Sequence, residues 1–210
     1  MKKRKLVGNL LLIIFAFALS VTFYSCYPYS STSPSEYDVV ITLHDDLSYF
    51  TGSFKKFAMR DSVDQISDGT GSNSISREYD NLIRTTVQNN LTNMGYTRVT
   101  DTASADIIIT LAVSKSSTLY INSYYPGGYW NWGYGGFYYP WSTAYTVTTG
   151  TVMVSMFDKK RIQPGSGKVT GIWMGIVNGV LDGTRTDVGT RISTGIDKCF
   201  TQSPYLKAVN

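Results

Sequence analysis

Along much of the chain, apolar residues recur at every second position, which is the pattern of a β-strand that buries one face. The clearest example is 106–113, where apolar side chains occupy the alternate positions from Ile107 to Val113. Similar patterns, bounded by turn-forming residues, predict further strands at 37–43, 54–59, 145–157 and 169–180. The loop between the last two contains proline and glycine, so we expect those strands to form an antiparallel hairpin.

Two other stretches carry apolar residues at intervals of three and four positions, which predicts amphipathic helices. The first covers 79–94 and is followed by Gly95, at the place where a helix commonly ends in a left-handed residue. The second covers 187–200 and ends before Pro204. Together these elements predict an α+β fold, a mainly antiparallel β-sheet with two amphipathic helices packed on it, in the order β-β-α-β-β-β-α.

The first 26 residues have the layout of a bacterial lipoprotein signal. A basic cluster at 2–5 precedes an apolar run at 10–19, and Ser25 and Cys26 follow at the expected cleavage point. We therefore expect residues 1–25 to be a signal peptide and Cys26 to carry lipid. The uncharged stretch before Cys26 is also long enough for a permanent membrane helix, and cleavage without lipidation would give a secreted protein. All three alternatives place the remaining chain outside the cytoplasm.

The domain layout follows from this signal. We expect residues 26–36 to be a lipidated tether and residues 37–205 to form a single domain. Tyr27 stands where an aspartate can retain lipoproteins at the inner membrane. We therefore expect the outer membrane of a Gram-negative cell envelope, with the domain facing the periplasm.

Charge and cysteine content narrow the functional classes. The chain has 19 Lys and Arg against 15 Asp and Glu, and four of the basic residues lie in the signal, so the mature chain is formally neutral. No basic surface for DNA or RNA is expected. With Cys26 lipidated, Cys199 is the only remaining cysteine, which excludes a disulfide framework. Cys199 lies on the apolar stripe of the second helix, which favours a small buried side chain over a reactive or intermolecular thiol.

An aromatic segment at 120–145 is the strongest candidate for a binding surface. It carries ten aromatic side chains and five glycines from Tyr124 to Trp141, and no charged residue occurs between Lys115 and Asp158. Such a composition predicts a loop between strands that contacts a protein or a glycan, packs on its own sheet, or touches the membrane. The candidate binding residues are Tyr124, Tyr125, Tyr129, Trp130, Trp132, Tyr134, Phe137, Tyr138, Tyr139 and Trp141.

Catalytic and metal-binding patterns are weak. His44 is the only histidine, and it precedes Asp45 and Asp46 at the end of a predicted strand, where polar turn residues are common. A metal site needs more ligands, and no serine lies in a nucleophile motif. We expect no metal, no cofactor and no enzymatic activity. The alternative is a hydrolase of envelope polymers, which requires a pocket with His44 and carboxylates within hydrogen-bonding distance.

Several short motifs, taken in order, resemble a known family of bacterial envelope lipoproteins with a domain of unknown function of the DUF4136 type. They are 54–59, Gly95-Tyr96, Ala105-Asp106, 149–152, Phe157-Asp158, 173–175 and the last helix with Ser203-Pro204. The resemblance covers nearly the whole mature chain. It implies an α+β domain with helices on a mainly antiparallel sheet, and it implies no particular activity.

Overall fold

The computed structural model describes residues 39–50, 54–66, 76–114, 137–138, 140, 150–163, 165–181 and 187–208. The predicted signal peptide 1–25, the tether 26–36 with Cys26, and most of the aromatic segment lie outside the described residues. The chain divides into two units, Met1–Ser33 and Pro34–Asn210. Every element described below belongs to the second unit.

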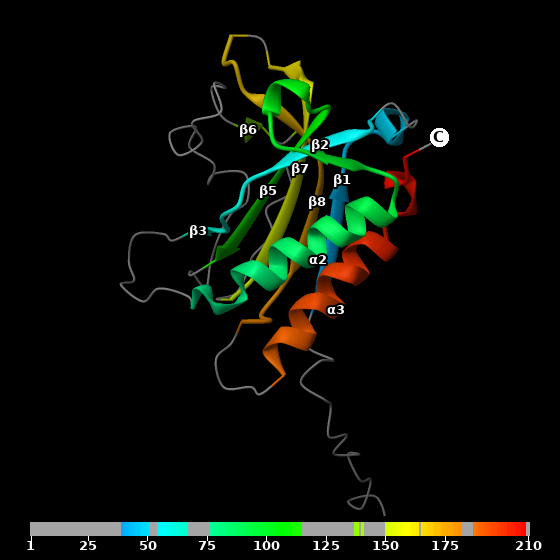
Figure 1. The fold of residues 1–210 in the computed structure, drawn as a ribbon. Coiled ribbons are helices and arrows are strands. Elements are labelled where there is room, and N and C mark those ends of the chain that lie inside the picture. Colours follow the sequence, from blue (N-terminus) through cyan, green and yellow to red (C-terminus); the bar gives the residue numbers. More distant parts are fainter. Residues whose placement is uncertain are drawn as a thin grey trace, which may run out of the picture. The chain divides into compact units, whose positions relative to one another are not determined.

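The described strands form one eight-stranded sheet with two helices on it (Figure 1). The strands are β1 Val40–His44, β2 Lys56–Met59, β3 Asp64–Ile66, β4 Thr97–Val99, β5 Ile107–Ser114, β6 Phe137–Tyr138, β7 Val152–Ile162 and β8 Val169–Val177. The α-helices are α2 Asp80–Asn93 and α3 Val188–Thr201. Short 3-10 helices occur at Leu47–Phe50, Arg77–Tyr79, Thr102–Ser104 and Pro204–Leu206.

The α+β class is confirmed, but the predicted strand arrangement and element order are wrong. The strand path is β1-β8-β7-β5-β2-β4, with β3 beside β5 and β6 beside β8. Pairs β1–β8, β7–β8 and β5–β7 are antiparallel, whereas β2–β4, β2–β5, β3–β5 and β6–β8 are parallel. The sheet is therefore mixed.

Three short strands account for the difference in order. The strands β3, β4 and β6 were not predicted, because two or three residues are too few to show an alternating pattern. The helix α2 lies between β2 and β4, and a helical connection returns the chain so that the second strand runs parallel to the first. The resulting order is β1-β2-β3-α2-β4-β5-β6-β7-β8-α3.

Both α-helices lie on the same face of the sheet and pack against each other (Figure 1). The helix α3 approaches β8 very closely, because a Cβ atom on Gly195 would lie 2.2 Å from Cγ1 of Val177. Trp173 of β8 is fully buried in this layer, and its Nε1 donates a hydrogen bond of 2.9 Å to Oγ of Ser203. The expectation that Trp173 is a packing residue is confirmed.

The end of α2 explains the Gly95-Tyr96 motif. Gly95 has a φ angle of 96°, as predicted for a left-handed residue after the helix. The amide of Tyr96 donates to the carbonyl of Leu91, and the amide of Gly95 donates to that of Thr92, which is the Schellman arrangement. The buried Tyr96 hydroxyl then donates to the carbonyl of Leu206 at 2.8 Å, which ties this turn to the end of the chain.

The opposite face of the sheet, called the second face below, is also apolar. Cross-strand partners share a face, so the register identifies its members. They are Ile41, Leu43, Ala58, Ile108, Thr110, Ala112, Met153, Ser155, Phe157, Met174 and Ile176. Every residue of β5 and β8 is buried, so these central strands are covered on both faces.

Candidate functional site

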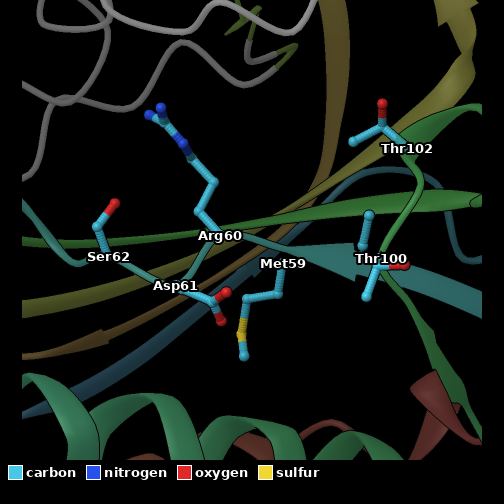
Figure 2. A pocket seen from close by; sticks show the side chains of 7 residues that line it. Met59, Arg60, Asp61, Ser62, Thr100 and Thr102 are labelled. Carbon is cyan, nitrogen blue, oxygen red and sulfur yellow. The ribbon is translucent and has the colours of Figure 1, made fainter.

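A polar cleft lies at the edge of the sheet where β2 and β4 end (Figure 2). The two strands run parallel with Ala58 opposite Val99, so the residues that follow each of them meet at one edge. The cleft has a volume of about 510 Å³ and is lined by Ala58, Met59, Arg60, Asp61, Ser62, Thr100 and Thr102. Figure 2 shows that these side chains diverge, because Met59 and Asp61 point toward the helix layer and Arg60 points away from it.

The Asp61 carboxylate in this cleft belongs to an ion-pair network. It lies 2.7 Å from the Arg98 guanidinium and 3.9 Å from that of Arg84. The hydrogen bond from Arg98 is the main cause that lowers the pKa of Asp61. Arg98 also donates to Oε1 of Gln88 at 2.7 Å, so the network joins β2, β4 and α2. A carboxylate held ionised in this way can position neighbouring elements but is a poor general acid at neutral pH.

Two further carboxylates with shifted pKa values lie near the start of β5. Burial raises the pKa of Asp158, although the Lys160 amide donates to it at 2.9 Å. Burial also opposes ionisation of Asp106, but hydrogen bonds from the amides of Lys55 and Lys56 outweigh it and lower the pKa. Carboxylates with shifted pKa values can mark a functional site. Here burial within β7 explains the raised pKa of Asp158, and the backbone amides explain the lowered pKa of Asp106, so both shifts follow from the fold.

His44 lies apart from the cleft, at the exposed end of β1. Its Nδ1 is 2.6 Å from the backbone carbonyl of Asp45, and its ring meets the Tyr205 ring edge-on at 4.9 Å. The Asp45 carboxylate instead accepts a hydrogen bond of 2.7 Å from Arg161, whose guanidinium also stacks 3.8 Å over Tyr49. Within the described residues, the structure does not bring His44 together with a carboxylate.

The base of the aromatic segment is the other candidate region, and its framework is well defined. The segment lies in the connection from β5 to β7, and at the base of this connection the Gly150 amide donates a hydrogen bond of 2.9 Å to the Ser114 carbonyl. The buried Arg191 of α3 donates to the carbonyls of Gly179 and Val180 in the turn after β8. The Leu181 amide in turn bonds to the Gly150 carbonyl at 3.0 Å. The connection that contains the segment therefore starts and ends on a hydrogen-bonded junction of β5, β7 and β8.

The candidate binding residues themselves are mostly not placed. Phe137 and Tyr138 form β6, which pairs with Val169 and Thr170 of β8. The remaining candidates lie outside the described residues: Tyr124, Tyr125, Tyr129, Trp130, Trp132, Tyr134, Tyr139 and Trp141.

Sequence patterns did not reveal the Asp61 network or the Arg191 contacts. Asp61 and Arg98 meet only because β2 and β4 are neighbours. Arg191 is a charged residue beside an apolar helical stripe, a position that normally indicates solvent exposure. Among the described residues, no cluster of three His, Cys, Asp or Glu could hold a metal ion. None of the described helices is long and apolar enough to span a bilayer.

Comparison with known proteins identifies the family and the fold. The model of a domain of unknown function, DUF4136, matches residues 40–205. A crystal structure of a DUF4136 family protein from Bacteroides thetaiotaomicron is similar, with a TM-score of 0.64 and 24% identity, over 82% of this chain and 98% of that one. No curated protein matches the sequence of this chain.

Two other solved structures show weaker likeness. PelC from Paraburkholderia phytofirmans, solved as a dodecamer, has a TM-score of 0.42 and 13% identity, covering 82% of this chain and 99% of that one. A PDZ domain protein from Parabacteroides distasonis has a TM-score of 0.43 and 16% identity, covering 79% of this chain and 36% of that one.

Proposed function

We propose that this chain, which belongs to the DUF4136 family, is a lipid-anchored, non-enzymatic module of the cell envelope that binds a protein or a glycan through its aromatic segment. A lipid on Cys26 holds it at the outer membrane, facing the periplasm. The tether keeps the domain near the membrane surface. Neither a cofactor nor a nucleic acid takes part.

The observation that carries this proposal is how the sheet holds the two ends of the connection that contains the aromatic segment. It connects the neighbouring central strands β5 and β7, and a hydrogen bond between Gly150 and Ser114 closes its base. Binding residues are commonly carried on loops that a rigid scaffold positions. Tyrosine and tryptophan offer a flat apolar face and a polar edge, which suits stacking on sugar rings and protein interfaces.

The contacts of the ionisable side chains favour binding over hydrolysis. Asp61 in the cleft is paired with Arg98, and Asp45 beside His44 is paired with Arg161. Both carboxylates therefore take part in contacts between elements of the fold. A hydrolase would instead need His44 and a carboxylate to converge on a substrate.

Substitution of three aromatic residues tests the proposal. The full-length protein in detergent is applied to a glycan array and to immobilised outer-membrane proteins. We expect the parent to bind one of these surfaces and the triple variant Tyr129→Ser, Trp130→Ser, Trp132→Ser to bind at least about tenfold more weakly, the loss of 1.4 kcal/mol or more. Both proteins should melt at similar temperatures.

Leu47→Ser is the matched control, because Leu47 is an exposed apolar residue outside the segment and is 52% accessible. This variant should bind as the parent does. Equal binding by the parent and the triple variant, or no binding by the parent to either surface, contradicts the proposal.

A further inference from the structure

The strand β1 leaves one edge of the sheet open (Figure 1). In the part of the chain that the structure describes, β1 pairs with β8 alone. All residues of β8 are buried, whereas residues 40–43 of β1 are half-buried and His44 is exposed. Val39, which precedes the strand, is 50% accessible. The strand β6 lies on the same side of β8 but pairs with Val169 and Thr170, beyond the end of β1.

Alternate residues of β1 direct their backbone groups to this outer edge. The Asp45 amide donates a hydrogen bond of 2.9 Å to the Ile172 carbonyl, so the odd-numbered residues of the strand bond to β8. In an antiparallel pair, the N–H and C=O groups of one residue point to the same side. The backbone groups of Val40, Thr42 and His44 therefore point away from β8. Such a row of groups is a template for pairing with another strand.

The strand β1 also lacks the features that usually protect an edge. Edge strands are commonly blocked by lysine or proline, by a β-bulge, or by being very short. The five residues of β1 include no proline, lysine, arginine or carboxylate, and their register with β8 is regular. The opposite edge differs, because β4 has three residues and its central Arg98 is paired with Asp61. The β1 edge is therefore the one suited to pairing.

We propose that β1 pairs antiparallel with β1 of a second copy of this chain, with Thr42 at the two-fold axis. In this register Val40 lies opposite His44 of the partner subunit. Each of the three outward residues exchanges an N–H and a C=O with the partner, which gives six backbone hydrogen bonds. A shift by two residues in either direction leaves four of these bonds within the strand. The centred register is therefore the most favourable one.

The side chains of β1 fit a second copy of the same strand. Ile41 belongs to the second face and lies opposite Leu43 of the partner subunit, so an apolar pair forms twice around the axis. Thr42 meets the partner's Thr42 on the helix face, and threonine pairs stabilise antiparallel strands. No like charges oppose each other along the paired strands. This inference uses neither the aromatic segment nor the lipid anchor, so it does not rest on the proposed function.

Disulfides that depend on the register test the inference. Full-length Ile41→Cys and Leu43→Cys variants with different tags are expressed together, and envelope fractions are oxidised. Opposed residues that do not share backbone hydrogen bonds have Cα atoms about 4.5 Å apart, which a disulfide can bridge. A dimer that carries both tags should form and should disappear on reduction. Diagonal neighbours are about 7–8 Å apart, so neither variant expressed alone should form this dimer.

Two controls set the background of this experiment. The parent carries only its natural cysteines and should give no dimer. Thr97→Cys places a thiol at an exposed position of β4, on the opposite edge, and should give no dimer with either variant. Absence of the dimer with both tags overturns the inference. A disulfide from Ile41→Cys to a different protein, as its main product, also overturns it, because the edge then pairs with another partner.

A charge at the axis keeps the test decisive if the cysteine variants do not fold. In Thr42→Lys, two ammonium groups oppose each other, so the dissociation constant of the dimer should rise at least about tenfold. Sedimentation of the full-length protein in detergent, corrected for bound detergent, measures this constant. Thr97→Lys makes the same change on β4 and should keep the value of the parent. A parent that sediments as a monomer at every concentration, or a Thr42→Lys variant that dimerises like the parent, overturns the inference.

Discussion

At the scale of single residues, burial raises the pKa values of Tyr96 and Cys199. Burial raises the pKa of the Tyr96 hydroxyl from 10.0 to about 12 and that of the Cys199 thiol from 9.0 to about 12. Both groups therefore stay neutral over the physiological range. This agrees with the interpretation of Cys199 as a small buried side chain, and its burial in the structure confirms the packing part of that interpretation.

These shifts predict a loss of stability in alkaline solution. A raised pKa in the folded protein stabilises it fully below the ordinary pKa, and this contribution is lost as pH rises toward the folded value. The free energy of unfolding should therefore fall between about pH 9 and pH 12, by up to about 1.4 kcal/mol per pH unit for each group. Urea titrations at pH 8 and pH 11 measure the fall.

Variants assign the fall to its source. Cys199→Ala should remove the fall in the free energy of unfolding between about pH 9 and 10, because in that range the Cys199 thiol ionises in the unfolded chain before Tyr96 does. Tyr96→Phe should remove part of the fall above about pH 10. If the variant with both changes loses as much stability between pH 8 and pH 11 as the parent, burial of these groups does not govern the alkaline response.

At the scale of elements, Gly195 lets α3 approach β8 closely. A Cβ atom on Gly195 would lie 2.2 Å from Cγ1 of Val177, a distance that no two unbonded carbon atoms adopt. The same strand needs a glycine at position 175, where a Cβ atom would lie 2.8 Å from the Trp173 ring. This gives a physical reason for the glycine in the 173–175 motif.

We expect Gly195→Ala to destabilise the domain by about 1–3 kcal/mol, because the added methyl group overpacks the interface. Val177→Ala removes the opposing methyl groups, so the double variant should lose less stability than the sum of the single changes. Gly189→Ala is the control, since its Cβ atom would meet only Leu82 at 3.4 Å and Tyr79 at 3.9 Å. Additive single effects in urea titrations would show that the helix shifts to admit the methyl group.

At the scale of the whole molecule, the proposed lipid anchor would determine where the domain acts. An extended tether of residues 26–36 would reach at most about 35 Å from the membrane. The family match begins at residue 40, so it includes neither the predicted signal nor the tether. The proposed localisation therefore rests on the sequence pattern alone, a basic cluster, an apolar run and Ser25-Cys26.

Replacement of Cys26 with Ala should abolish labelling of the protein by a palmitate analogue in Gram-negative cells, because the thiol is the first acceptor of lipid. It should also release the protein from the outer-membrane fraction. Ser25→Ala keeps a small residue before the cysteine and should be labelled as the parent is. Labelling that survives in the Cys26→Ala variant would refute lipidation at this residue.

Local patterns in the sequence predicted the long elements well. The strands at β1, β2, β5, β7 and β8 and both α-helices lie where periodicity placed them, apart from shifts at their ends. Gly95 marked the end of α2, because only a residue tolerant of positive φ suits that position. These features depend on residues close together in the chain, so the sequence by itself determined them.

Tertiary structure alone decided which elements are neighbours. The parallel pairing of β2 with β4 and β5 follows from the path of the chain through α2, and it brings Asp61 to Arg98 across 37 residues. Arg161 reaches Asp45 because β1 and β7 lie on either side of β8 in the sheet. The spacing of apolar residues indicates only the type of each element and the face that it buries. Contacts between distant residues depend on how all the elements pack together, and no local pattern contains that information.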